Sequence, residues 1–152
     1  MRIEHSITIE RPIEEVFAFS AAPENYPLWV SAILGVESTS AGPVETGSTF
    51  VEDTKALGLE FSVQCEVVAY EPPHLFAWRG SGGPMSIELR HSCDPIDGGT
   101  KVTAVQEVEL DGVFRLAGPA MSQYLKRTLE GDFTTLKELL EGAPAAGGDD
   151  AG

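Results

Sequence analysis

The stretch MSQYLKRTLEGDFTTLKELLE, residues 121–141, decides the fold. Its apolar side chains recur every three or four positions, which is the spacing of a single stripe along an α-helix. The stripe consists of Met121, Leu125, Leu129, Phe133, Leu136 and Leu140. Charged residues such as Lys126, Glu130 and Lys137 fall on the opposite side. One long helix cannot bury such a stripe against itself, so it needs a partner surface.

The sequence before this helix supplies that surface, because it alternates apolar and polar residues with the period of two expected of strands. The clearest strand covers residues 59–67. The other strands are predicted over residues 3–9, near 36, and over 49–55, 75–79, 85–93 and 102–110. Turn signals such as Asp97-Gly98-Gly99 separate them and favour antiparallel pairing. We therefore expect an α+β fold in which a curved antiparallel sheet of about seven strands surrounds the long helix.

Two short helices are predicted between the first and second strands, over residues 12–22 and 23–29, each beginning near a proline. The glycine-rich run 80–84 is predicted to be a loop between the fifth and sixth strands. Before the long helix, Gly118-Pro119 leaves two alternatives open. Either the helix begins at Pro119, or a short helix from Val113 precedes it. Residues 1–141 are expected to form one domain and 142–152 a disordered tail.

Composition limits the classes of partner. The chain of 152 residues carries a formal net charge of −14, which opposes binding to nucleic acid and to anionic membrane surfaces. Neither a membrane span nor a signal peptide is recognisable, so we expect a cytoplasmic protein. The two cysteines, Cys65 and Cys93, are predicted to lie about 10 Å apart on strands separated by one other, too far for a disulfide.

Several short segments resemble those of a known superfamily. They are ITIERP (7–12), YPLW (26–29), EPPHL (71–75), GGTKV (98–102) and LKELLE (136–141). Together with the order of elements, they resemble the SRPBCC or START-like helix-grip (Bet v 1-like) superfamily, and within it the bacterial polyketide cyclase/dehydrase-like branch. The resemblance covers residues 1–141 and implies a mostly apolar pocket between sheet and helix for a lipid or polyketide-like molecule. Some members of the superfamily are aromatases or cyclases, and many are carriers or sensors.

Motifs for metal, phosphate or nucleophilic chemistry are not recognisable in the sequence, so no cofactor and no metal are expected. Candidate ligand-binding residues are therefore those predicted to face the space under the long helix. They are Trp29, Phe61, Cys65, Trp78, Ile87, His91, Gln106, Met121, Tyr124 and Leu125. As a group, the aromatic members are typical of an apolar cavity lining.

Polar residues on apolar faces are the candidates for orienting a ligand or for catalysis, because burying an unpaired polar group costs ~1–3 kcal/mol. His91 shares a strand face with Ile87, and Asp132 falls within the helical stripe. If these two side chains met, they would form an acid–base pair. The structural alternatives are a histidine satisfied by the protein itself and an aspartate at the wet edge of the helix.

Three hypotheses follow. In the first, the protein encloses an apolar small molecule in the cavity between the sheet and the long helix. In the second, it is a cyclase, aromatase or dehydratase that uses a histidine or carboxylate to move a proton. In the third, its acidic surface binds a basic protein and the cavity has no ligand. The sequence leaves the oligomeric state open.

Overall fold

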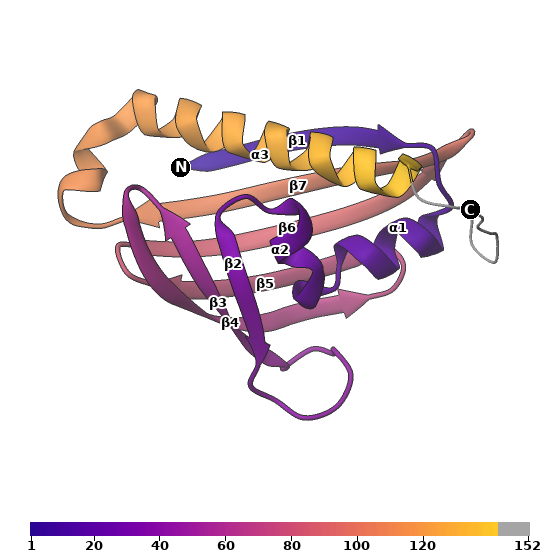
Figure 1. The fold of residues 1–152 in the computed structure, drawn as a ribbon, viewed down its shortest axis with the longest axis horizontal. Helices are drawn as coiled ribbons and strands as arrows, with labels where there is room; N and C mark the ends of the chain where they lie inside the picture. The colour runs from indigo at the N-terminus through magenta and orange to yellow at the C-terminus, as the bar shows by residue number, and fades with distance from the viewer. Residues whose placement is uncertain (143–152) are drawn as a thin grey trace.

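The computed structural model describes residues 1–142, and within them the strands form one seven-stranded sheet crossed by a long helix (Figure 1). The strands are β1 (Arg2–Ile9), β2 (Ile33–Ser38), β3 (Thr49–Ala56), β4 (Leu59–Glu71), β5 (Leu75–Gly82), β6 (Met85–Ile96) and β7 (Gly99–Leu110). They are arranged in the order β1-β7-β6-β5-β4-β3-β2, and each neighbouring pair is antiparallel. The predicted helix-grip fold is confirmed.

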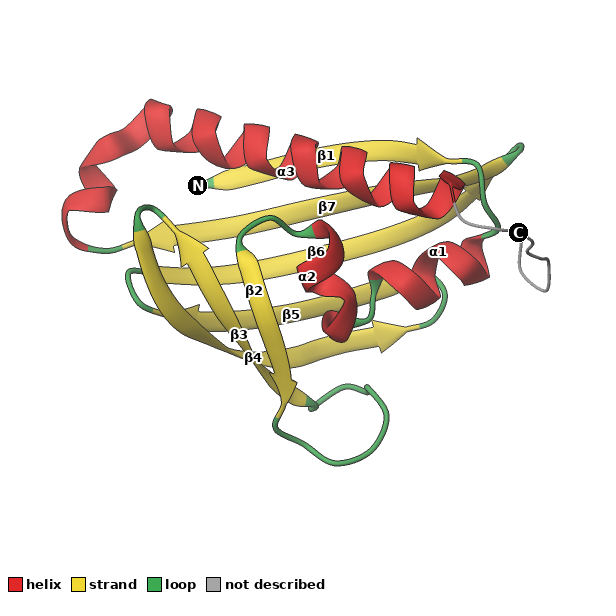
Figure 2. Cartoon of the chain, in the orientation of Figure 1, coloured by secondary structure: helices red, strands yellow, loops and turns green. Residues whose placement is uncertain are grey.

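The helices lie on one side of this sheet and at its ends (Figure 2). They are α1 (Ile13–Ser20), the short 3₁₀ helix η1 (Pro23–Asn25), α2 (Tyr26–Trp29), the 3₁₀ helix η2 (Gly112–Ala117) and α3 (Gly118–Gly142). The structure combines the two alternatives before the long helix: η2 precedes α3, and α3 begins at Gly118, one residue before Pro119. Helix α3 runs alongside β1, and α2 contacts both β2 and α3. None of the helices in residues 1–142 combines the length and apolarity needed to cross a membrane.

The apolar stripe of α3 is buried unevenly. Leu129, Phe133 and Leu136 are at most 5% exposed, and burial of each such side chain contributes about 1.5–3 kcal/mol. Nearer the N-terminus of the helix, Leu125 is half-buried and Tyr124 is 48% exposed. The C-terminal half of α3 therefore packs closely on the sheet, whereas its N-terminal half does not.

Hydrogen bonds fix the C-terminal half of α3 to the end of β1. The Lys137 ammonium donates to the carbonyl oxygen of Thr8 at 2.6 Å. The backbone N–H of Glu10 donates to the Glu141 carboxylate at 2.8 Å, and Arg11 Nε donates to the carbonyl oxygen of Leu140 at 2.9 Å. This end of the helix is thus held by polar contacts as well as by apolar packing.

The glycine-rich run differs from its prediction. Strand β5 continues through Gly82, so the connection to β6 is limited to residues 83–84. A Cβ atom at Gly80 would lie 2.9 Å from the Sγ atom of Cys65, and one at Gly82 would overlap the carbonyl oxygen of Ser62. Glycine is needed in β5 because the strand passes so close to β4.

The cysteine prediction is confirmed. Cys65 and Cys93 are free and buried, and β5 separates their strands. The predicted tail of residues 142–152 lies, from residue 143 onward, outside the described residues, and α3 ends at Gly142.

Two glycine substitutions are expected to change stability in opposite directions. Gly82→Ala should lower the free energy of unfolding by about 2 kcal/mol or more, because the new methyl group overlaps the β4 backbone. Gly131→Ala should raise it by about 1 kcal/mol, because this position is inside α3 and a Cβ atom there meets open space. Urea unfolding of both variants measures the difference. Equal stability of the two variants would contradict the close approach of β5 to β4.

Candidate functional site

A cavity of about 140 Å³ lies between the sheet and α3, where the N-terminal half of the helix packs less closely. Its lining side chains come from α2 and the segment after it, from the inward faces of the strands β2 to β7, and from α3. Most of them are apolar, including Val63, Leu89 and Leu129. The uneven burial of the helical stripe therefore coincides with an internal space, and this space is the first candidate site.

Most of the predicted site residues line this cavity. They are Trp29, Trp78, Ile87, His91, Gln106, Tyr124, Leu125 and Asp132. Tyr124 is about half exposed and lies at the edge of the lining. The structure therefore brings together residues from five separate elements, as the pattern of inward faces predicted. Whether these residues bind a ligand remains a prediction.

Phe61, Cys65 and Met121 do not line the cavity. The ring of Phe61 is instead so close to Gly83 that a Cβ atom there would be 2.5 Å from it. The Sγ atom of Cys65 lies under Gly80 for the same reason. Met121 is half-buried in the first turn of α3. Strand alternation assigned Phe61 and Cys65 to the correct face, but the close contact of β4 with β5 fills the space in front of them.

His91 has a partner within the fold. Its Nε2 atom is 2.9 Å from the Ser20 hydroxyl, and this hydroxyl donates to the carbonyl oxygen of Val16 at 2.7 Å. Because the Ser20 proton is used in that bond, His91 donates from Nε2 to Ser20. Burial lowers the pKa of His91 to about 4, so the ring is neutral near pH 7. The structural alternative for His91, a satisfied histidine, is the one observed.

Asp132 is also engaged by the protein. Its carboxylate accepts a hydrogen bond of 3.0 Å from the backbone N–H of Ser31, which connects α3 to the segment after α2. Burial raises the pKa of Asp132, and the hydrogen bonds from Ser31 oppose that rise. Within residues 1–142 no hydrogen bond or ion pair joins Asp132 to His91. The hypothesised acid–base pair is therefore not formed, because each group is bonded elsewhere.

Glu52 is the cavity residue that the sequence analysis missed. It lies on β3 between the inward-facing Phe50 and Thr54, is 4% exposed, and lines the cavity. Among the described residues none donates a hydrogen bond to its carboxyl group, and burial raises its pKa from 4.5 to about 8. The sequence contains a sign of this, because Glu52 falls in the alternation of the inward-facing residues of its strand. The adjacent Asp53, which faces outward, obscured that alternation.

Two tryptophans of the cavity differ in their hydrogen bonding. Trp78 Nε1 donates to the Tyr26 hydroxyl at 3.1 Å. Burial, and next the charge of Glu52, raise the pKa of Tyr26, which keeps its phenol protonated. Trp29 Nε1, by contrast, is buried and has no partner among residues 1–142. Among the described lining residues, Trp29 Nε1 is thus a fully buried donor without a partner, and the side chains of Glu52 and Gln106 also make no hydrogen bond.

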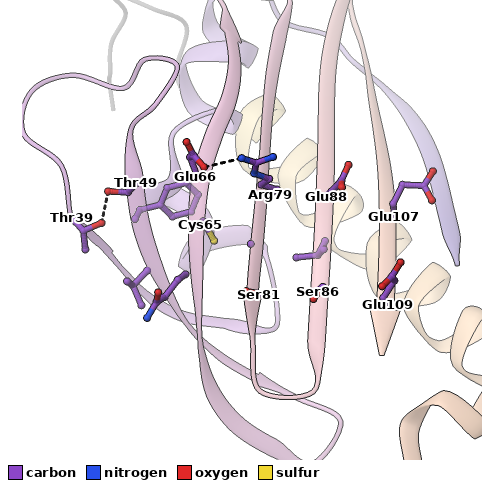
Figure 3. Close-up of a pocket in the computed structure, with 15 residues that line it drawn as sticks. Thr39, Thr49, Cys65, Glu66, Arg79, Ser81, Ser86, Glu88, Glu107 and Glu109 are labelled. Atoms are coloured by element: carbon purple, nitrogen blue, oxygen red, sulfur yellow. Dashed lines mark hydrogen bonds and ion pairs between the residues drawn. The ribbon is translucent and has the colours of Figure 1, made fainter. Parts of the chain in front are cut away.

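A larger hollow of about 800 Å³ lies on the opposite face of the sheet, open to solvent (Figure 3). Arg79 points toward Glu66, and their ion pair measures 3.2 Å. Glu88, Glu107 and Glu109 lie on the strands beyond it. Exposed ion pairs of this kind contribute about 0–1 kcal/mol and their groups are hydrated. The inner cavity is the better candidate, because its polar groups are desolvated.

Comparison with known proteins agrees with this architecture. The family model described as "Polyketide cyclase / dehydrase and lipid transport" matches residues 1–141. A START superfamily protein from Mycobacterium smegmatis has 18% sequence identity and a TM-score of 0.81, covering 93% of this chain and 97% of its own. A protein from Thermus thermophilus has 15% identity and a TM-score of 0.79, covering 93% and 98%. A search of curated proteins finds no match.

The protein Ara h 8.0201 has the same fold at 18% identity, with a TM-score of 0.71 over 94% of this chain and 99% of its own. These structural likenesses define a helix-grip protein. The chain belongs to the polyketide cyclase/dehydrase and lipid transport family.

Glu52 is expected to make the folded state less stable as pH rises. Between pH 4.5 and about 8 the folded state holds a proton on Glu52 that the unfolded state has lost. The free energy of unfolding should therefore fall with increasing pH, by up to ~1.4 kcal/mol per unit in this window. Glu52→Gln should remove this fall, and Glu88→Gln, on the outer face of the sheet, should not. Urea unfolding between pH 5 and 9 measures it, and identical slopes for wild type and Glu52→Gln would contradict the burial of a carboxyl group.

His91 is expected to act in the opposite direction. Its pKa is lowered from 6.5 to about 4, so below pH 6.5 the unfolded state binds a proton that the folded state does not. Stability conferred by the neutral ring is therefore lost as pH falls from about 6.5 to about 4. His91→Gln, whose amide can still donate to Ser20, should lose less stability on acidification than wild type, as followed by urea unfolding at pH 4–7. Equal acid sensitivity of the two proteins would place His91 in a solvated environment.

Proposed function

We propose that this protein binds a compact apolar small molecule in the cavity between α3, α2 and the sheet. The observation that carries the proposal is the uneven burial of the α3 stripe above an internal space of about 140 Å³. A helix that needed only to close the core would be packed along its whole length. The description of the family, which includes lipid transport, supports the same function.

The size of the cavity favours a ring-sized ligand. An apolar cavity of about 150 Å³ is known to stay dry and to admit a molecule such as benzene. Pockets for drug-sized ligands are larger, about 300–1,000 Å³. Burial of each ~100 Å² of apolar ligand surface would contribute about 2.5 kcal/mol before the cost of ordering the complex. An extended lipid chain would require the N-terminal half of α3 to move away from the sheet.

An enzymatic function is the second candidate, and Glu52 is the observation that favours it. A carboxyl group with a pKa near 8 is protonated at neutral pH and is suited to act as a general acid. His91 and Asp132 are less suited, because their hydrogen bonds to Ser20 and Ser31 occupy them. A cyclase or dehydratase of this kind would retain ligand binding but lose turnover of a polyketide-like substrate in Glu52→Gln.

Binding is tested by titrating p-xylene into the protein and following backbone amide shifts by NMR. We expect saturable shifts confined to residues around the cavity. Ala104→Leu, which enlarges a lining side chain on β7, should weaken binding at least tenfold, equivalent to about 1.4 kcal/mol.

Val105→Leu is the matched control, because its side chain is next on the same strand and faces away from the cavity. It should bind p-xylene like the wild type. The absence of saturable shifts, or equal binding by Ala104→Leu, would refute the cavity as a binding site.

A further inference from the structure

We propose that the ligand is an uncharged molecule bearing an alcohol or phenol hydroxyl, which hydrogen-bonds to the Trp29 indole N–H and the Glu52 carboxyl group, and that carboxylate ligands are excluded. This inference rests on the proposed function, and it specifies the chemical class of the ligand. It is carried by the polar groups that the fold leaves unpaired in the cavity and by the charges that surround them.

Trp29 requires an acceptor from the ligand. Its Nε1–H is buried, lines the cavity and has no partner within residues 1–142. The indole is held by an edge contact with Tyr26 at 5.7 Å between ring centroids and by Phe133 at 6.1 Å, so rotation toward another partner is restricted. An indole N–H can only donate, and leaving a buried donor unpaired is unfavourable. A ligand oxygen would complete this bond.

Glu52 requires a donor or an acceptor. The carboxyl group lines the cavity from β3, and no described residue forms a hydrogen bond or ion pair with it. With its pKa raised to about 8, it is protonated at neutral pH and can both donate and accept. A hydroxyl group on the ligand also does both. A hydroxyl group therefore offers both the acceptor that Trp29 needs and the donor or acceptor that Glu52 needs.

The charges around the cavity exclude an acidic ligand. Of the described residues that line it, none is lysine or arginine, whereas two, Glu52 and Asp132, are acids. His91 is neutral, because burial lowers its pKa to about 4. A bound carboxylate would be a buried charge without a counterion, which is strongly unfavourable. A protonated amine could pair with the acidic side chains, but an ammonium group cannot accept a hydrogen bond from the Trp29 N–H.

Three para-substituted toluenes test this selectivity, each titrated at pH 7 by NMR: p-cresol and p-xylene, which have nearly equal shape, and the larger anion 4-methylbenzoate. We expect p-cresol to bind about 3–10-fold more tightly than p-xylene, because it adds hydrogen bonds to the same ring. We expect 4-methylbenzoate to bind at least tenfold more weakly than p-xylene.

Variants locate the hydrogen bonds. Trp29→Phe retains an aromatic ring without the N–H and should reduce the ratio of the p-cresol to the p-xylene affinity to near unity, whatever its effect on the affinity for the ring itself. Glu52→Leu should also reduce the preference, whereas Glu52→Gln, whose amide still donates and accepts, should restore it. Glu88→Gln on the outer face of the sheet is the control and should bind all three probes like the wild type.

The outcomes separate this inference from the proposed function. If p-xylene binds but p-cresol binds no more tightly, or if 4-methylbenzoate binds most tightly, the inference is wrong and the proposed function stands. If none of the three probes binds, both are wrong. Because the wild-type comparison needs no substitution, the inference stays testable even if Trp29→Phe fails to fold.

Discussion

The contact between α3 and the inner face of the sheet is the interaction on which the rest of the structure depends. The C-terminal half of the helix is buried through Phe133 and Leu136 and is hydrogen-bonded to the end of β1 by Lys137. Toward its N-terminus the contact with the sheet loosens, and Lys126 bonds only to the carbonyl oxygen of Glu4 at the surface. Because α3 is fixed at its C-terminal end and packs loosely toward its N-terminal end, the fold contains a cavity and still has a closely packed core.

The buried polar groups divide into those that hold the fold and those that remain unpaired. Ser20, His91 and Asp132 bond to other elements, and these bonds connect α1 to β6 and α3 to the chain after α2. Trp29 and Glu52 make no such bond, although both are almost fully buried. Burial of unpaired polar groups opposes folding, so a ligand of the proposed kind would relieve an unfavourable feature of the fold at these two side chains. The groups most conspicuous in the sequence, His91 and Asp132, are therefore structural in their observed bonding.

Features set by residues close together in the sequence could be predicted, whereas contacts between residues far apart in the sequence could not. Strand alternation and helical spacing are local, and they predicted the sheet, the long helix and the inward faces that carry Trp78 and Gln106. The Ser20–His91 bond joins residues 71 positions apart, and no local pattern reports it. The glycines of β5 were assigned to a loop because a turn and a close strand approach require the same residue type. Glu52 was locally visible as a charge in an apolar phase, and the neighbouring Asp53 obscured it.

The net charge of the chain disfavours the binding of anions, as the lining of the cavity does. A formal charge of −14 creates a negative potential around the whole molecule, which lowers the concentration of anionic ligands near its surface. An anion that entered would then meet the Asp132 carboxyl group and no basic side chain among the described lining residues, in a space of low dielectric constant where like charges repel more strongly than in water. For a neutral hydroxyl-bearing molecule both effects are small, and its binding depends on apolar burial and hydrogen bonds. Under the proposed function, the acidic composition, which by itself indicates only solubility, disfavours anionic ligands together with the cavity, whose described lining residues include no basic side chain.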